Sequence, residues 1–158
     1  MFVRYYVDLA VPFDAVEERL LDAPERWLPG LLEDAEDRGA RLLADVGFPV
    51  TRTAVDGQRI EVSIGDVYRG PGKSSIPVTW TAEGGERLFP SLDGDVEVAA
   101  LGERRTQLSI SARYRAPTGA AARALDRALM HRVVEATVKD FLDRVARALD
   151  APTDRSAV

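Results

Sequence analysis

The sequence predicts an α+β domain in which an antiparallel sheet is covered on one face by a long C-terminal helix. Apolar and polar residues alternate over residues 2–11 and again in several stretches between residues 41 and 114. Such a period of two is typical of strands that are buried on one side only. Residues 120–149 contain neither Pro nor Gly and are rich in Ala, Arg and Leu, which is typical of a helix. A sheet with one apolar face needs a cover, and this helix is the longest candidate.

Length, net charge and composition indicate which class of protein this is. The chain has 158 residues and a net charge of -5, which indicates one domain over residues 1–150 and a flexible tail over residues 151–158. The acidic balance argues against a nucleic acid or an anionic membrane as the partner. There is no Cys, no signal-peptide pattern and no apolar run of about 18 residues. We therefore expect a cytoplasmic protein without integral membrane association or disulfides.

The N-terminal third predicts one strand followed by short helices. Residues 2–11 place alternate apolar side chains on one face of a strand. Residues 13–21 predict a first short helix. A second begins at Pro24, since proline is favoured in the first turn. Pro29 and Gly30 then break the pattern, and a further turn of helix follows over residues 31–38, ending at Gly39.

Five further strands are predicted between this region and the C-terminal helix, which gives about six to seven strands in all. They fall near residues 41–48, 60–68, 76–82, 92–100 and 106–114, with turn residues between them. The C-terminal helix is predicted over residues 118–149. Because sheets twist, such a sheet curves around the helix, and its rims can enclose space that side chains do not fill.

This layout resembles the helix-grip fold of the START-like superfamily, also called Bet v 1-like or SRPBCC, over residues 2–149. The stretches that carry the resemblance to actinobacterial members are WLPGL at 27–31, IPVTW at 76–80, LFPSLDG at 88–94, TQLS at 106–109 and YRAP at 114–117. The resemblance implies a cavity between sheet and helix. The superfamily includes lipid and hormone carriers, polyketide cyclases/dehydrases and other enzymes, so the resemblance transfers no catalytic residue.

Aromatic residues supply the first candidates for the lining of such a cavity. Five of them fall on predicted core-side positions and either fill the core or contact a ligand, two interpretations that stay open: Tyr5, Tyr68, Trp80, Phe89 and Tyr114.

Polar candidates come from the C-terminal helix and one strand. His131, the only histidine, and Arg127 extend the apolar stripe of the helix toward its N-terminus. If they face inward, His131 serves as a hydrogen-bond partner or proton carrier and Arg127 binds an anionic group of the ligand. If the helix bends, both are in solvent. Asp66 lies on an otherwise apolar strand face and either pairs with a cation in the pocket or is solvated at the strand end.

No cofactor or metal is expected. One His and no Cys leave only carboxylates as ligands, and the Asp/Glu spacing matches no calcium loop. The Gly72-Lys73-Ser74 sequence lacks the first glycine of a phosphate-binding loop and precedes a strand.

The sequence therefore favours a protein that binds a hydrophobic or amphipathic small molecule, such as a lipid, a polyketide or an aromatic compound. Two alternatives stay open: an enzyme of the polyketide cyclase/dehydratase kind, and an interaction protein whose pocket is vestigial. Whether the protein is an enzyme, which ligand it binds and its oligomeric state are all left open.

Overall fold

The computed structural model describes residues 1–45, 59–83, 91–115 and 126–150 of the chain. The elements within these ranges are β1 (Phe2–Leu9), α1 (Phe13–Leu21), α2 (Pro24–Asp45), β2 (Arg59–Ile64), β3 (Tyr68–Gly70), β4 (Lys73–Glu83), β5 (Ser91–Gly102), β6 (Arg105–Arg115) and α5 (Arg127–Asp150).

The strands form one antiparallel sheet with the order β1-β6-β5-β4-β2, and β3 pairs with β4 beside β2. Alternate residues of each strand point to one face, called here the inner face, as the alternation in the sequence predicts. The buried apolar residues of this face are Val3, Leu9, Ile76, Val78, Trp80, Leu92, Val96, Val98, Leu108, Ile110, Ala112 and Tyr114.

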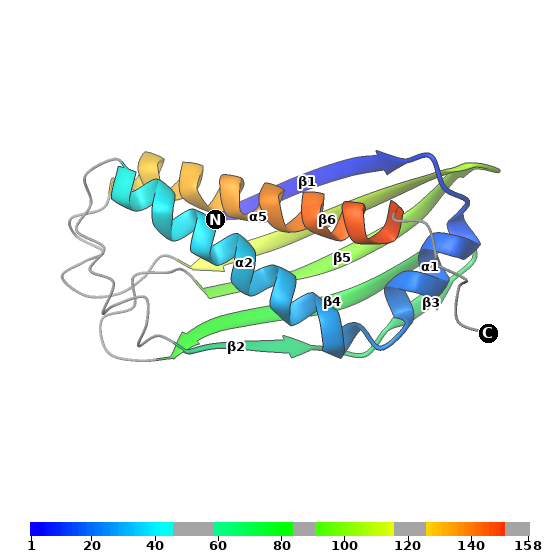
Figure 1. Ribbon diagram of the computed structural model, residues 1–158, viewed down its shortest axis with the longest axis horizontal. Helices are drawn as coiled ribbons and strands as arrows, with labels where there is room; N and C mark the ends of the chain where they lie inside the picture. The colour runs from blue at the N-terminus through cyan, green and yellow to red at the C-terminus, as the bar shows by residue number, and fades with distance from the viewer. Residues whose placement is uncertain (46–58, 84–90, 116–125, 151–158) are drawn as a thin grey trace, which may run out of the picture.

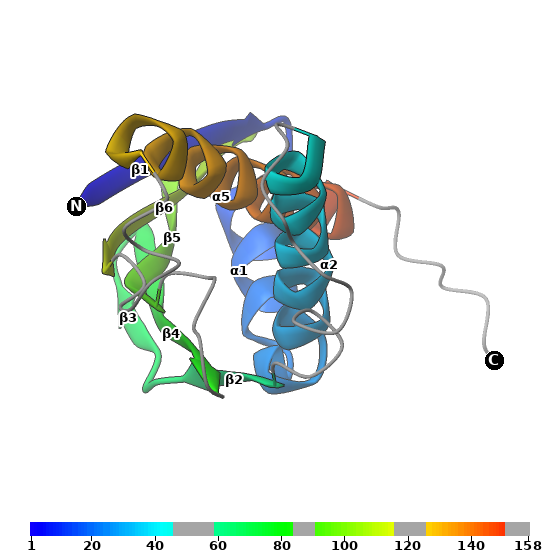
Figure 2. The ribbon, with the colours of Figure 1, turned by 90° about the vertical axis from the view of Figure 1, so that its left-hand side faces the viewer.

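Three helices cover the inner face (Figures 1 and 2). The C-terminal helix α5 packs along β1 and β6, α1 lies across one end of β5 and β6, and α2 packs on α5 and contacts β2. This is the predicted α+β helix-grip arrangement. The prediction named only the C-terminal helix as the cover of the sheet, whereas α2 covers part of the inner face as well.

The prediction of separate short helices after α1 is wrong, because α2 runs unbroken for 22 residues through Pro29. The prediction of a strand from residue 41 is also wrong up to residue 45, and residues 46–48 lie outside the described residues. A proline inside a helix costs about 3 kcal/mol. Burial of Leu28, Leu32 and Ala35 along one face of α2 offsets this cost.

The strand predicted from residue 60 to 68 is interrupted at residues 65–67. Ile64 pairs with Val78 and Tyr68 pairs with Ser75, so three residues oppose the two between Val78 and Ser75. One of these two is Pro77, which has no N–H for the ladder. The extra residue reverses the facing of every later side chain. The assignment of Tyr68 to the core side is therefore wrong: its side chain is 60% exposed.

The apolar stripe predicted for α5 is confirmed in its C-terminal part. Val134, Val138, Phe141, Val145 and Leu149 are all buried. The predicted start of the helix is not confirmed, because Asp126 lies outside the helix and residues 118–125 are outside the described residues.

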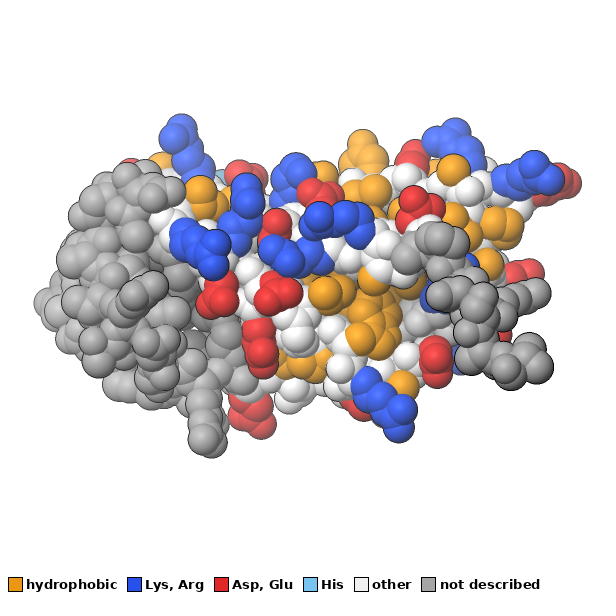
Figure 3. Space-filling model, in the orientation of Figure 1, with side chains coloured by type: hydrophobic (Ala, Val, Ile, Leu, Met, Phe, Trp, Pro, Cys, Tyr) orange, Lys and Arg blue, Asp and Glu red, His pale blue; other side chains and the backbone are white. Residues whose placement is uncertain are grey.

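The outer surfaces of α2 and α5 carry interspersed charges of both signs (Figure 3). Two ion pairs join the helices, Arg38–Asp140 at 3.7 Å and Arg144–Asp34 at 3.4 Å. In each pair the α2 residue, Arg38 or Asp34, is exposed, whereas its α5 partner, Asp140 or Arg144, is partly buried. Among the helices of the described ranges, none has the length and apolarity that crossing a membrane requires.

Candidate functional site

One cross-strand row of the inner face brings two of the aromatic candidates together. Val62 pairs with Trp80, Trp80 with Leu92, and Leu92 with Tyr114, so the row spans β2, β4, β5 and β6. Trp80 and Tyr114 are 6% and 1% exposed. Directly opposed side chains on one face of a sheet are neighbours. The row therefore forms an apolar surface that ends in a phenol at Tyr114.

His131 meets this row from α5. The Tyr114 hydroxyl oxygen lies 2.9 Å from Nδ1 of His131, and the two rings stack with centroids 6.1 Å apart and an interplanar angle of 27°. His131 lies one turn after the start of α5, where the apolar stripe gives way to polar residues. A strand residue and a helix residue thus form the polar end of an apolar face.

Glu135 holds the other nitrogen of the imidazole. Its Oε1 lies 3.1 Å from Nε2 of His131, one helical turn along α5. A carboxylate accepts a hydrogen bond, so the tautomer that suits this contact has its proton on Nε2 and leaves Nδ1 as an acceptor. The Tyr114 hydroxyl then donates to Nδ1. When His131 is protonated, Nδ1 donates to the phenol oxygen instead.

Met1 closes one side of the phenol. The Tyr114 hydroxyl lies 2.9 Å from Sδ of Met1, and the Tyr114 backbone N–H donates to the Met1 carbonyl at 2.8 Å. Thioether sulfur is a weak acceptor. When His131 is protonated, the phenol proton is directed to Met1 or to a ligand.

The environment keeps this phenol in its protonated form. Burial raises the pKa of Tyr114 above its ordinary value of 10.0, the Glu135 carboxylate raises the pKa further, and the Arg127 cation partly offsets both. At neutral pH Tyr114 is therefore a neutral hydroxyl that donates one hydrogen bond and accepts others.

Two of the predicted site residues, Tyr114 and His131, thus come into contact, and Trp80 lies in the same row. Arg127 is exposed in the first turn of α5 and acts on Tyr114 through its charge. Tyr5 is half-buried on β1, where its hydroxyl donates to Asp143 at 3.4 Å. Asp66 is exposed outside the strands and Tyr68 is on the outer face, so neither shares the inner face. Phe89 lies outside the described residues.

Glu135 and Met1 were not among the predicted site residues. The sequence does contain a signal for Glu135: it lies four positions after His131, and residues four apart on a helix are neighbours. Met1 carried none, because its place beside Tyr114 depends on the β1–β6 register, in which Phe2 pairs with Arg113.

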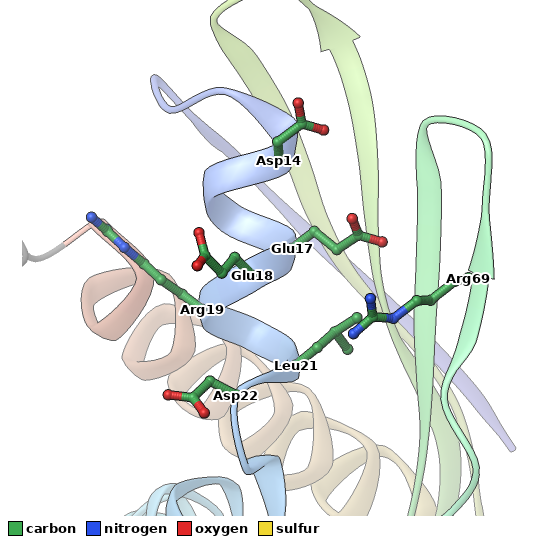
Figure 4. A pocket seen from close by; sticks show the side chains of 7 residues that line it. All are labelled: Asp14, Glu17, Glu18, Arg19, Leu21, Asp22 and Arg69. Atoms are coloured by element: carbon green, nitrogen blue, oxygen red, sulfur yellow. The ribbon is translucent and has the colours of Figure 1, made fainter.

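A polar hollow lies between α1 and β3, away from the Tyr114 row. It has a volume of about 690 Å³ and is lined by Asp14, Glu17, Glu18, Arg19, Leu21, Asp22 and Arg69. Figure 4 shows Arg69 reaching from β3 toward α1, with Glu17 and Leu21 on the side of α1 that faces it. Ser74, fully buried on β4, donates a hydrogen bond to Glu17. The cavity predicted beside Trp80 and Tyr114 is a separate expectation, which this hollow does not test.

Comparisons with known proteins bear on the fold. No family model matches the sequence, and no curated protein matches it. A solved structure of a conserved protein from Geobacillus kaustophilus superposes with a TM-score of 0.54 at 14% identity, covering 94% of this chain and 95% of that one. This likeness shows a shared fold.

Two further solved structures are similar at lower scores. The Zhui aromatase/cyclase from a Streptomyces species has a TM-score of 0.41 at 16% identity and covers 100% of this chain and 99% of its own. The protein TTHA0849 from Thermus thermophilus has a TM-score of 0.37 at 16% identity and covers 94% of this chain and 99% of its own.

Proposed function

We propose that this protein is a START-like domain that binds an amphipathic small molecule on the inner face of its sheet. The apolar or aromatic body of the ligand lies against the Trp80–Leu92–Tyr114 row, and a hydroxyl or carbonyl group meets Tyr114. The observation that carries the proposal is the 2.9 Å contact between the buried Tyr114 hydroxyl and His131 at the end of an apolar face. The sequence resemblance and the helix-grip fold support it.

The chemistry of this pair selects the kind of ligand. A pocket that is mostly apolar with a few placed polar groups is the common form of a small-molecule site. The phenol oxygen of Tyr114 accepts a hydrogen bond from a ligand hydroxyl while the phenol proton points to His131. With His131 protonated, the phenol donates to a ligand carbonyl. A ligand without an oxygen function leaves these groups without a new partner, and a lipid, polyketide or aromatic compound that carries one gains affinity.

The experiment uses Trp80 as the reporter. The chain has two tryptophans, and Trp27→Phe leaves Trp80 as the only one. We expect 2-naphthol to quench Trp80 fluorescence in this background and to bind more tightly than 2-methylnaphthalene. Tyr114→Phe and His131→Asn should each weaken 2-naphthol binding roughly tenfold and leave 2-methylnaphthalene unaffected.

Tyr6→Phe is the matched control, because Tyr6 is 61% exposed on the outer face of β1. It should bind 2-naphthol as the background does. Equal affinity of the Tyr114→Phe variant and the background for 2-naphthol would contradict the proposal, as would the absence of any Trp80 response.

The hydrogen-bonded chain Glu135–His131–Tyr114 favours a second function, proton transfer in an enzyme of the cyclase/dehydratase kind. A carboxylate that orients an imidazole, which in turn contacts a hydroxyl, is a common arrangement for general acid–base catalysis. In this function the Tyr114 proton turns from Nδ1 of His131 to a ligand carbonyl. Nδ1 of the neutral imidazole is then free to take up the proton that leaves the adjacent carbon.

Exchange of the α-hydrogens of 2-tetralone in deuterated buffer, followed by NMR, tests this second function. Enolisation moves a proton from carbon to a base, and ketonisation returns a deuteron from solvent. We expect the wild type to catalyse this exchange faster than the Tyr114→Phe and Glu135→Gln variants do. A rate equal to that of buffer alone would reject catalysis of this kind and leave the binding function standing.

A further inference from the structure

A second hollow, called here the β1–α5 groove, lies between the edge strand of the sheet and the C-terminal helix. It has a volume of about 320 Å³ and is lined by Val3, Arg4, Tyr5, Arg132, Glu135, Ala136 and Lys139. Three lining residues are consecutive on β1. Those on α5 are Arg132, Glu135, Ala136 and Lys139, which share one helix face because Glu135 and Ala136 each lie three or four positions from both Arg132 and Lys139. The groove therefore follows the junction of two well-defined elements.

The floor of the groove is apolar. Val3 is 6% exposed, and Ala136 and Tyr5 are half-buried. The Tyr5 ring has the Lys139 ammonium 5.3 Å from its centroid, a cation–π distance that holds the ring in place. The floor of the groove thus offers an apolar surface to the ring of a flat ligand.

Positive charge surrounds this floor. Lys139 is paired with Asp143 at 2.6 Å. Glu135 lies 3.1 Å from Nε2 of His131 and keeps its negative charge when that imidazole is neutral. Arg4 and Arg132 are exposed, and neither forms an ion pair with any other described residue. In a chain with a net charge of -5, a groove whose lining contains Arg4, Arg132 and Lys139 but only one carboxylate, Glu135, is complementary to an organic anion. The guanidinium fork matches the geometry of a carboxylate.

We propose that the β1–α5 groove binds a small organic acid, with its aromatic or short aliphatic body on Val3, Tyr5 and Ala136 and its carboxylate at Arg4 and Arg132. The volume lies at the lower end of the range for small-molecule sites, about 300–1,000 Å³, so the ligand is the size of a bicyclic aromatic acid. This site is separate from the Trp80–Leu92–Tyr114 row and shares Glu135 with the Tyr114–His131 contact.

Calorimetric titration with 2-naphthoate tests the proposal, with 2-naphthamide as the neutral analogue of the same shape. We expect 2-naphthoate to bind and 2-naphthamide to bind at least tenfold more weakly. Arg4→Gln and Arg132→Gln should each weaken 2-naphthoate binding roughly tenfold, and added salt should weaken it further. Arg104→Gln, in the exposed β5–β6 turn, removes the same charge elsewhere and should bind as the wild type does.

Amide NMR shifts locate the acid. Changes at Tyr5, Ala136 and Lys139 support the groove, whereas changes confined to Leu92 and Tyr114 would overturn the proposal. Equal affinity for acid and amide would also overturn it, as would wild-type affinity in both arginine variants. Because both arginines are exposed, circular dichroism should show that the two variants are folded. A loss of 2-naphthoate affinity then reports on the groove and not on unfolding.

Discussion

The Tyr114 hydroxyl oxygen of β6 and Nδ1 of His131 of α5 lie 2.9 Å apart, and this contact joins the sheet to the helix at the polar end of the inner face. When Nδ1 of His131 is unprotonated it accepts a hydrogen bond, and the protonated Tyr114 phenol supplies the donor.

The first prediction concerns alkaline pH. The pKa of Tyr114 is raised above 10.0 in the folded protein, first by burial and then by Glu135. A folded-state pKa above the unfolded value contributes stability that is fully present below the unfolded pKa and is lost as the pH rises through the folded one. Urea unfolding from about pH 8 to about pH 11 should therefore show a steeper loss of stability in the wild type than in Tyr114→Phe. Parallel curves would contradict the raised pKa.

The second prediction concerns the buried face of α5. Phe141 is fully buried, and Phe141→Ala should cost about 3–5 kcal/mol because it loses transfer free energy and leaves a cavity. Asp143→Ala should cost less than about 1 kcal/mol. Its partly exposed carboxylate pairs with Lys139 at 2.6 Å, and exposed pairs are weak. Denaturant titrations of the two variants measure the difference, and similar midpoints would refute the assigned face.

The third prediction concerns close packing between β5 and β6. A Cβ added to Gly94 would lie 2.6 Å from both the Ala112 Cβ and the Ser111 carbonyl oxygen. Because backbone atoms cannot yield at that distance, Gly94→Ala should destabilise the protein by about 1–3 kcal/mol. Gly30→Ala is the control, since nothing lies within 4 Å of an added Cβ there. It should be neutral or stabilising, because alanine is the better helix former. Equal thermal unfolding temperatures would show that β5 accommodates a side chain.

The fourth prediction concerns the contact between α1 and β4. Ser74 is fully buried and donates to Glu17. Ser74→Ala should therefore cost about 1–2 kcal/mol through the lost hydrogen bond to a charged acceptor. Ser75→Ala, on the half-buried outer side of the same strand, should cost less than about 0.5 kcal/mol. Chemical unfolding distinguishes the two, and a neutral Ser74→Ala would contradict a stabilising role for the Ser74–Glu17 hydrogen bond.

Local pattern was sufficient to predict the strands whose alternation reflects burial, such as β6 with Leu108, Ile110 and Tyr114, and the stripe of α5 around Phe141. It was also sufficient to single out His131 and Tyr114. In each case the side-chain period follows from backbone geometry, which every residue of the element shares. The helix α2 was mispredicted because Pro29 and Gly39 are local break signals, and the packing of its buried face overrides them.

By itself, the sequence determined the α+β class, the facing of the regular strands and the apolar stripe of the last helix, since these depend on periodicity. Only the tertiary structure decided that Tyr68 faces outward, that Met1 lies against the Tyr114 hydroxyl, and that Arg4 and Arg132 line one groove. Each of these depends on register, through the one-residue bulge opposite Pro77 and the pairing of β1 with β6. Register brings together residues far apart in the chain, and no local period encodes it.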